Sequence, residues 1–91
     1  MQLEWRDEAD ADIFEILSYI AERNFPAAEG LKESIERAIE HLADHPYLYK
    51  PSLRKLGWRE IVVQPNYIVF YKVTDKVCIM AVAHSRQMYP S

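Results

Sequence analysis

The stretch WREIVVQPNYIVFYKVTDKVCIMAVAH, residues 58–84, contains three runs rich in β-branched and aromatic residues, at 58–64, 67–73 and 77–84. Such side chains favour β-strands because they pack well on a pleated surface. The separators, at 65–66 and 74–76, are short enough to force consecutive runs to pair antiparallel. The sequence therefore predicts a three-stranded antiparallel meander.

The middle run, residues 67–73, has apolar side chains at both alternating sets of positions. Successive side chains of a strand point to opposite faces of the sheet, so neither face of this run is cleanly polar. We expect one face to pack against helices and the other to be a concave or partner-covered surface.

Helical periodicity precedes the three runs. Apolar residues recur at three- and four-residue steps over residues 7–23, and acidic residues load the first turn, where the helix dipole favours anions. Pro26 suits the first position of a second helix, whose apolar stripe runs to Leu42. The short link between them predicts an antiparallel helical hairpin. Before it, residues 3–5 form a short extended segment that could join the sheet.

The predicted fold class is therefore α+β: a short N-terminal strand, an antiparallel helical hairpin, then a three-stranded antiparallel meander. A chain of 91 residues with 49% hydrophobic side chains fits a single domain over residues 1–91. Its apolar runs are far shorter than the roughly 20 residues that cross a bilayer, and its charged N-terminus is unlike a secretory signal. We expect a cytoplasmic protein that makes no membrane contact.

Cysteine usage points the same way. The single cysteine, Cys78, cannot close a disulfide within the chain, and no Cys/His spacing suggests zinc. We expect a reducing compartment, no metal site and no cofactor.

Charge is unevenly spread along the chain. Residues 1–45 carry twelve acidic and four basic side chains, a net charge of −8, whereas residues 46–91 carry two acidic and seven basic side chains, a net charge of +5. Such asymmetry suggests that the second half meets an acidic partner. The alternative is that the two halves attract each other within the fold.

A series of short motifs runs nearly end to end, from Trp5 to Pro90. They are Trp5 before an acidic helix, ILSYIA at 16–21, NFPAAEGL at 24–31, HP at 45–46, GWRE at 57–60, YIVFY at 67–71 and VAHSRQ at 82–87. In this order they resemble the RelE/ParE superfamily of toxins from bacterial type II toxin–antitoxin systems. The helix end YIAxxN at 19–24 and HxRQ at 84–87 are more similar to the ParE branch.

The resemblance implies a growth inhibitor, encoded on a chromosome or plasmid, that a cognate antitoxin from the same operon holds inactive in a hetero-oligomer. ParE-type members poison DNA gyrase by protein–protein contact, whereas RelE-type members cleave mRNA in the ribosomal A site. A third possibility is a decayed toxin that retains only antitoxin binding.

A ribonuclease needs a proton acceptor, a proton donor and cations that hold the charge developing on the phosphate. By similarity to RelE-like enzymes, the candidates here are Arg59, His84, Arg86 and Tyr89. The structural alternatives are that Arg59 caps the sheet edge or pairs with an acidic residue, and that His84 lies at the surface or orients the C-terminal segment. The formal net charge of −3 is poorly suited to docking on ribosomal RNA, so we favour the non-enzymatic gyrase inhibitor.

Two contact surfaces follow from this interpretation. The loop at residues 46–55 and the segment at residues 84–90 would meet the target, through Lys50, Arg54, Lys55, Arg86 and Tyr89. The antitoxin, partly disordered when free, would lay a helix in a groove and add a strand at a sheet edge. Its candidate contacts are Ile13, Leu17, Ile20 and Trp58, the last at the start of the edge strand expected over residues 58–64.

Overall fold

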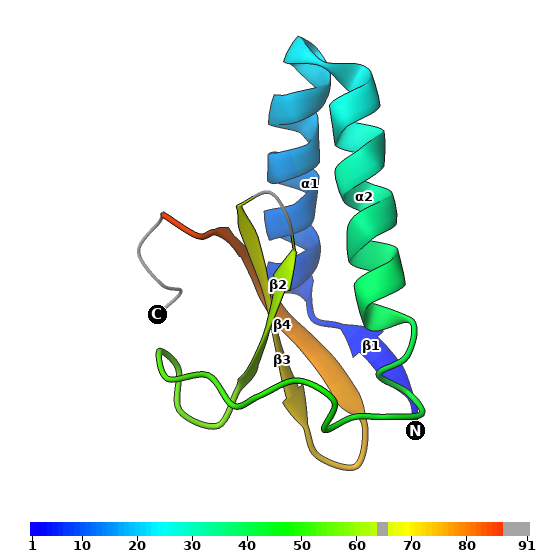
Figure 1. Ribbon diagram of the computed structural model, residues 1–91, viewed down its shortest axis with the longest axis vertical. Helices are drawn as coiled ribbons and strands as arrows, with labels where there is room; N and C mark the ends of the chain where they lie inside the picture. The colour runs from blue at the N-terminus through cyan, green and yellow to red at the C-terminus, as the bar shows by residue number, and fades with distance from the viewer. Residues whose placement is uncertain (64–65, 87–91) are drawn as a thin grey trace.

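The computed structural model describes residues 1–63 and 66–86. Its elements follow the predicted order and confirm the α+β class (Figure 1): β1 (Leu3–Trp5), α1 (Asp7–Arg23), α2 (Phe25–Ile39), β2 (Arg59–Val63), β3 (Tyr67–Val73) and β4 (Val77–His84). The second helix ends earlier than predicted. The apolar stripe does continue to the fully buried Leu42, but Leu42 lies in a turn that follows the helix. Its amide donates a hydrogen bond to the carbonyl of Ile39.

The four strands form one sheet in the order β1-β4-β3-β2. The predicted meander is present, because β2 pairs antiparallel with β3 and β3 antiparallel with β4. The short strand β1 pairs parallel with the first part of β4, from Leu3 beside Val77 to Trp5 beside Ile79. Beyond that point α1 continues along β4.

Side chains at the start of α1 satisfy the backbone of β4 where β1 no longer pairs with it. The Nε of Arg6 donates to the carbonyl of Met80 at 2.6 Å, and the amide of Val82 donates to the carboxylate of Asp12 at 3.0 Å. Buried backbone groups need such partners, so these contacts fix the position of α1 against the sheet.

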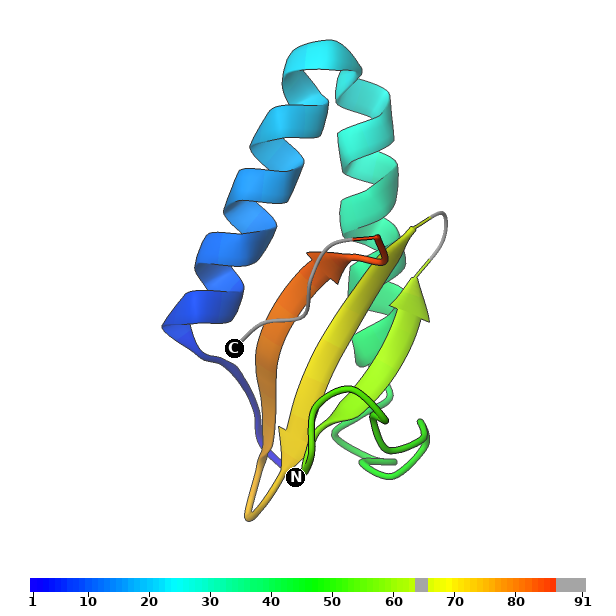
Figure 2. The ribbon, with the colours of Figure 1, turned by 90° about the vertical axis from the view of Figure 1, so that its left-hand side faces the viewer.

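The helical hairpin covers one face of the sheet, and the end that joins α1 to α2 projects beyond it (Figure 1 and Figure 2). Asn24 caps the second helix, because its Oδ1 accepts the amide of Ala27 at 3.1 Å. The buried residues of α2 recur at helical spacing and meet the helix-facing side chains of the strands. The resulting core includes Leu31, Ile35, Ile39, Ile61, Val69, Tyr71 and Ile79.

The opposite face of the sheet carries a second apolar cluster, formed by Trp58, Ile68, Phe70, Ala81 and Ala83. Burial on both faces of the sheet was predicted, and here it is achieved within the chain, apart from Val62, which is 63% exposed. A register shift opposite Phe70 and Tyr71 leaves Met80 without a paired residue on β3. After this bulge Val82 faces the helices while Ala81 and Ala83 face away.

Candidate functional site

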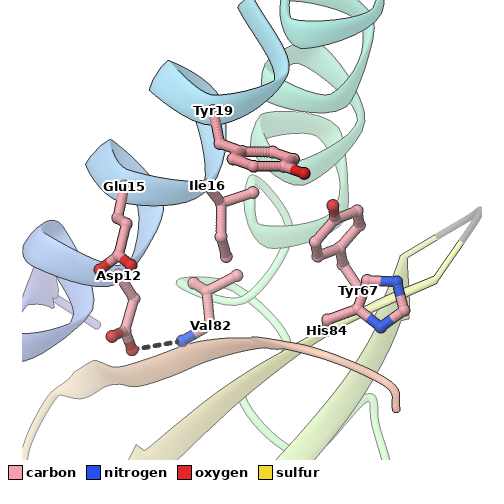
Figure 3. Close-up of a pocket in the computed structure, with 7 residues that line it drawn as sticks. All are labelled: Asp12, Glu15, Ile16, Tyr19, Tyr67, Val82 and His84. Atoms are coloured by element: carbon pink, nitrogen blue, oxygen red, sulfur yellow. Dashed lines mark hydrogen bonds between the residues drawn. The ribbon is translucent and has the colours of Figure 1, made fainter. Parts of the chain in front are cut away.

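A cavity of about 350 Å³ opens between α1 and the sheet, at the start of β3 and the end of β4 (Figure 3). We call it the acid–aromatic cleft, and its lining residues are Asp12, Glu15, Ile16, Tyr19, Tyr67, Val82 and His84. The four from α1 share one helix face because Glu15, Ile16 and Tyr19 follow Asp12 by three, four and seven residues. The three from the sheet come together because Tyr67 and His84 are paired across β3 and β4.

Carboxylates and rings occupy different sides of this cleft (Figure 3). Asp12 and Glu15 lie along α1, and Asp12 accepts the amide of Val82. The rings of Tyr67 and His84 meet edge to face, with centroids 5.2 Å apart. The Nδ1 of His84 accepts the amide of Arg86 at 3.1 Å. The cleft therefore joins negative charge to aromatic surface.

Arg59 lies at the other end of the sheet. It is paired with Tyr71 on β3, whereas His84 is paired with Tyr67, four residues away on the same strand. Four residues of strand span about 13 Å, and β2 and β4 are a further two strand spacings of about 5 Å apart. The structure thus separates Arg59 from His84 by far more than hydrogen-bond reach.

Arg59 is also engaged locally. Its Nη1 donates to the carbonyl of Tyr49 at 2.7 Å, and its guanidinium lies over the ring of Tyr47, 4.8 Å from the centroid. Of the other ribonuclease candidates, Arg86 is exposed just after β4, and Tyr89 lies outside the described residues.

The long connection from α2 to β2 is anchored to the rest of the fold by tyrosines. The hydroxyl of Tyr71 donates to the carbonyl of Pro46 at 2.9 Å, and that of Tyr49 donates to the carbonyl of Ala38 at 3.4 Å. Burial raises the pKa of the Tyr71 phenol above its ordinary value of 10.0. This connection is therefore held against the sheet rather than left free.

The predicted target-contact residues of the loop share one hydrogen-bonded turn. Ser52 donates to the carboxylate of Glu60, and its oxygen accepts the amides of Arg54 and Lys55, each at 3.0 Å. Glu60 is 9% exposed, and its carboxylate lies 3.7 Å from the guanidinium of Arg54. Lys50, which is exposed, accepts the amide of Glu60 on its carbonyl at 3.2 Å. These contacts hold the loop in one shape.

Two leucines of the same turn were missed by the sequence reasoning. Leu53 and Leu56 are each 99% exposed. Gly57, with φ +85, turns the chain into β2 immediately after them. Leucines three residues apart in a Pro- and Gly-bounded basic segment, PSLRKLG at 51–57, were the available signal. We call Leu53 and Leu56, together with Lys50, Arg54 and Lys55, the leucine–lysine loop.

A second hollow runs along the helical hairpin. One part, of about 330 Å³, lies between α1, α2 and β1, and a neighbouring part of about 570 Å³ continues along the two helices. Together they form what we call the hairpin groove, and both parts are lined by Asp10, Ile13, Leu17 and Lys32.

The hairpin groove contains two of the four predicted antitoxin contacts, Ile13 and Leu17. Ile20 packs against the main core, as Ile13 and Leu17 also do, but it does not line the groove. Trp58 is 7% exposed and packs on Phe70, with Arg6 and Lys55 over its ring at 5.4 and 4.9 Å. Trp58 therefore presents little surface to another protein.

Within residues 1–63 and 66–86, no group of three or more His, Cys, Asp or Glu side chains is placed to hold a metal ion. No helix in the part of the chain that the structure describes has both the length and the apolar character needed to cross a membrane.

The fold is shared with a solved structure, the chromosomal ParDE toxin–antitoxin system from P. aeruginosa, with a TM-score of 0.77 over 92% of this chain and 95% of that one, at 19% identity. Among curated proteins, the chain is 31% identical to toxin RelE2 of Caulobacter vibrioides over 96% of its own length and 98% of the relative's. It is 27% identical to the putative toxin Y4kP of Sinorhizobium fredii, over 98% and 93% of the two lengths.

The family itself is defined by a match to residues 3–89. The chain belongs to the ParE toxin family of type II toxin–antitoxin systems, parDE. This confirms the resemblance to the RelE/ParE superfamily and makes the chain a toxin component, for which the family implies a cognate antitoxin.

Proposed function

We propose that this toxin acts in the cytoplasm by inhibiting DNA gyrase through protein contact, and that it does not cleave mRNA. The observation that carries the proposal is the separation of Arg59 from His84, which lie at opposite ends of the sheet on strands two apart. Acid–base catalysis needs its groups within about 3 Å of the same reacting atoms. Arg59 is further held by the carbonyl of Tyr49, which favours a structural role.

The surroundings of His84 support the same conclusion. None of the seven described residues that line the acid–aromatic cleft is lysine or arginine, and two of them are carboxylates (Figure 3). A scissile phosphate develops negative charge that a ribonuclease must neutralise with cations. Asp12 and Glu15 would repel that charge instead.

The leucine–lysine loop is the surface that we assign to the target. A fully exposed leucine gains most by entering a pocket on another protein, and flanking lysines and arginines steer it to an acidic surface. Leu53 and Leu56 meet this description, in a turn that Ser52 and Glu60 already hold in place. Little ordering entropy then remains to be lost on binding.

The test is a supercoiling and cleavage assay on purified gyrase, run beside ribosome-programmed mRNA cleavage with the same preparation. We expect gyrase inhibition and intact mRNA. The double variant L53S/L56S should raise the concentration for half-inhibition at least about tenfold, as loss of an interface anchor does. The control V62T alters an exposed apolar residue outside the loop and should leave inhibition unchanged.

Cut mRNA with unaffected gyrase would overturn the proposal. Arg59, His84, Arg86 and Tyr89 would then be the first residues to replace. Gyrase inhibition that L53S/L56S leaves intact would retain the target and reject the loop as the contact.

For the antitoxin, we propose that an apolar helix docks in the hairpin groove. Ile13 and Leu17 line both parts of the groove, and Phe14 and Phe25, which line one part, are 74% and 61% exposed. Amphipathic helices bind such grooves through apolar residues at three- and four-residue spacing.

The test is co-purification with the protein that the neighbouring gene of the operon encodes. Leu17→Glu should abolish capture while the melting curve of the free toxin shows a folded protein. Val62→Glu, which adds the same charge on the opposite face of the sheet, should not. Equal capture by both variants would remove the groove from the interface.

A further inference from the structure

The acid–aromatic cleft is not used by the gyrase contact or by the hairpin groove. We propose that it binds the guanidinium group of an arginine side chain from a partner peptide. The proposal rests on the proposed function in one respect, which is that the antitoxin is taken as the protein that carries this arginine.

The two carboxylates of the cleft favour a cationic ligand. Glu15 is exposed at the cleft and has no ion-pair partner in the part of the chain that the structure describes. Asp12 uses one carboxylate oxygen to accept the amide of Val82 and retains the other. A guanidinium presents several N–H donors in a planar fork, which matches the acceptors of a carboxylate.

The aromatic rings of the cleft favour a cation that can stack on them. Figure 3 shows the rings of Tyr19, Tyr67 and His84 on the side of the cleft that faces Asp12 and Glu15, with Ile16 and Val82 between the two groups, so a long side chain entering the cleft meets both. Cations are attracted to the faces of such rings, and arginine is the commonest partner. One face of the Tyr19 ring already carries the guanidinium of Arg23, 3.7 Å from the centroid, so this ring accepts such a stack and has only its other face for the partner's arginine.

Size and charge together exclude other ligand classes. A volume of about 350 Å³ lies at the small end of ligand pockets and suits one long side chain. Phosphate or carboxylate ligands would face Asp12 and Glu15. Lysine would satisfy the charge, but its compact, strongly hydrated ammonium does not stack on rings as a planar guanidinium does.

The assay follows the NMR signals of the isolated toxin during titration with N-acetyl-arginine amide. The amide of Val82 reports on the Asp12 carboxylate that it contacts, and the ring signals of Tyr67 report on the aromatic side. We expect both to shift with saturation in the millimolar range, and N-acetyl-lysine amide to bind more weakly. N-acetyl-citrulline amide has nearly the same shape without the charge and should shift neither.

Three variants test whether the arginine amide binds in the acid–aromatic cleft. Glu15→Gln should weaken binding of the arginine amide about fivefold, which is the effect of removing one exposed ion pair. Tyr19→Leu should weaken it about threefold by removing a stacking ring. Glu33→Gln changes the net charge equally on the surface of α2, outside the cleft, and should have no effect. All three positions are exposed, so each variant should fold.

Three results would overturn the proposal: no saturable shift at Val82 and Tyr67, equal shifts with the citrulline amide, or equal weakening by the Glu15 and Glu33 variants. Gyrase takes no part in this titration. Failure of arginine binding is therefore distinguishable from failure of the proposed target.

Discussion

Arg59→Ala is the substitution that best separates a structural from a catalytic arginine. It removes a guanidinium donor 2.7 Å from the carbonyl of Tyr49 and the stack over Tyr47. A hydrogen bond to a charged group contributes about 1.5–3 kcal/mol, and a partly exposed cation–π contact about 0.5–1 kcal/mol. Because the site is only half-buried, we expect the free energy of unfolding to fall by about 2–3 kcal/mol.

Circular dichroism during thermal unfolding measures this loss. For a domain of this length, about 1 kcal/mol corresponds to roughly 4–8 °C, so Tm should fall by roughly 8–24 °C. At a temperature where the variant is fully folded, the gyrase inhibition that we propose should be equal in the variant and the parent chain.

Two controls accompany the measurement. Arg37→Ala removes an exposed guanidinium 3.9 Å from the Glu33 carboxylate and should cost only about 0.3–0.5 kcal/mol. Arg59→Lys keeps the charge but loses the planar fork, so its Tm should lie between those of the parent and the alanine variant.

The reasoning would be refuted by an Arg59→Ala variant that melts with the parent chain yet has lost toxicity. Such a result would make Arg59 a functional residue. Arg59 would then again be a candidate ribonuclease residue, despite its distance from His84.

Three further outcomes are expected. Tyr71→Phe removes the hydrogen bond to the Pro46 carbonyl and should cost about 1–2 kcal/mol in urea unfolding. Because the pKa of Tyr71 is raised in the folded state, its contribution to stability is complete below the ordinary tyrosine pKa of about 10. This contribution is lost as the pH rises through the pKa of Tyr71 in the folded state, and Tyr71→Phe should abolish the dependence of stability on pH in this range. Asp12→Ala removes the acceptor 3.0 Å from the Val82 amide, so hydrogen exchange at that amide should become at least about tenfold faster. Asp12→Asn should restore part of the protection. Gly57→Ala should cost about 1 kcal/mol in thermal unfolding, purely from the backbone, because φ is +85 and nothing lies within 4 Å of an added Cβ.

The order and type of the elements could be predicted from the sequence because the signals are local. The bounds of β3 and β4 match the β-rich runs, and those of α1 match the helical periodicity. The end of α2 could not be placed, because Leu42 continues the apolar stripe and is buried although it lies in a turn. Burial and helical geometry are separate properties, and the pattern reports only burial.

The candidate site was predictable only in part. Ile13 and Leu17 were selected from their spacing, and both line the hairpin groove, while their contact with an antitoxin stays a prediction. The exposure of Trp58 depends on how Phe70, Arg6 and Lys55 surround it, which no local pattern contains.

The fold class and the family could be inferred from the sequence, because strand and helix periods, turn spacing and ordered motifs are properties of neighbouring residues. Which residues lie together in a site depends on the packing of the whole chain. The bulge at Met80 sets which face of β4 meets α1, and the pairing through β3 places His84 beside Tyr67 and leaves Arg59 at the other end of the sheet. Contacts between strands distant in the chain arise from register, and register is fixed only when the whole core packs.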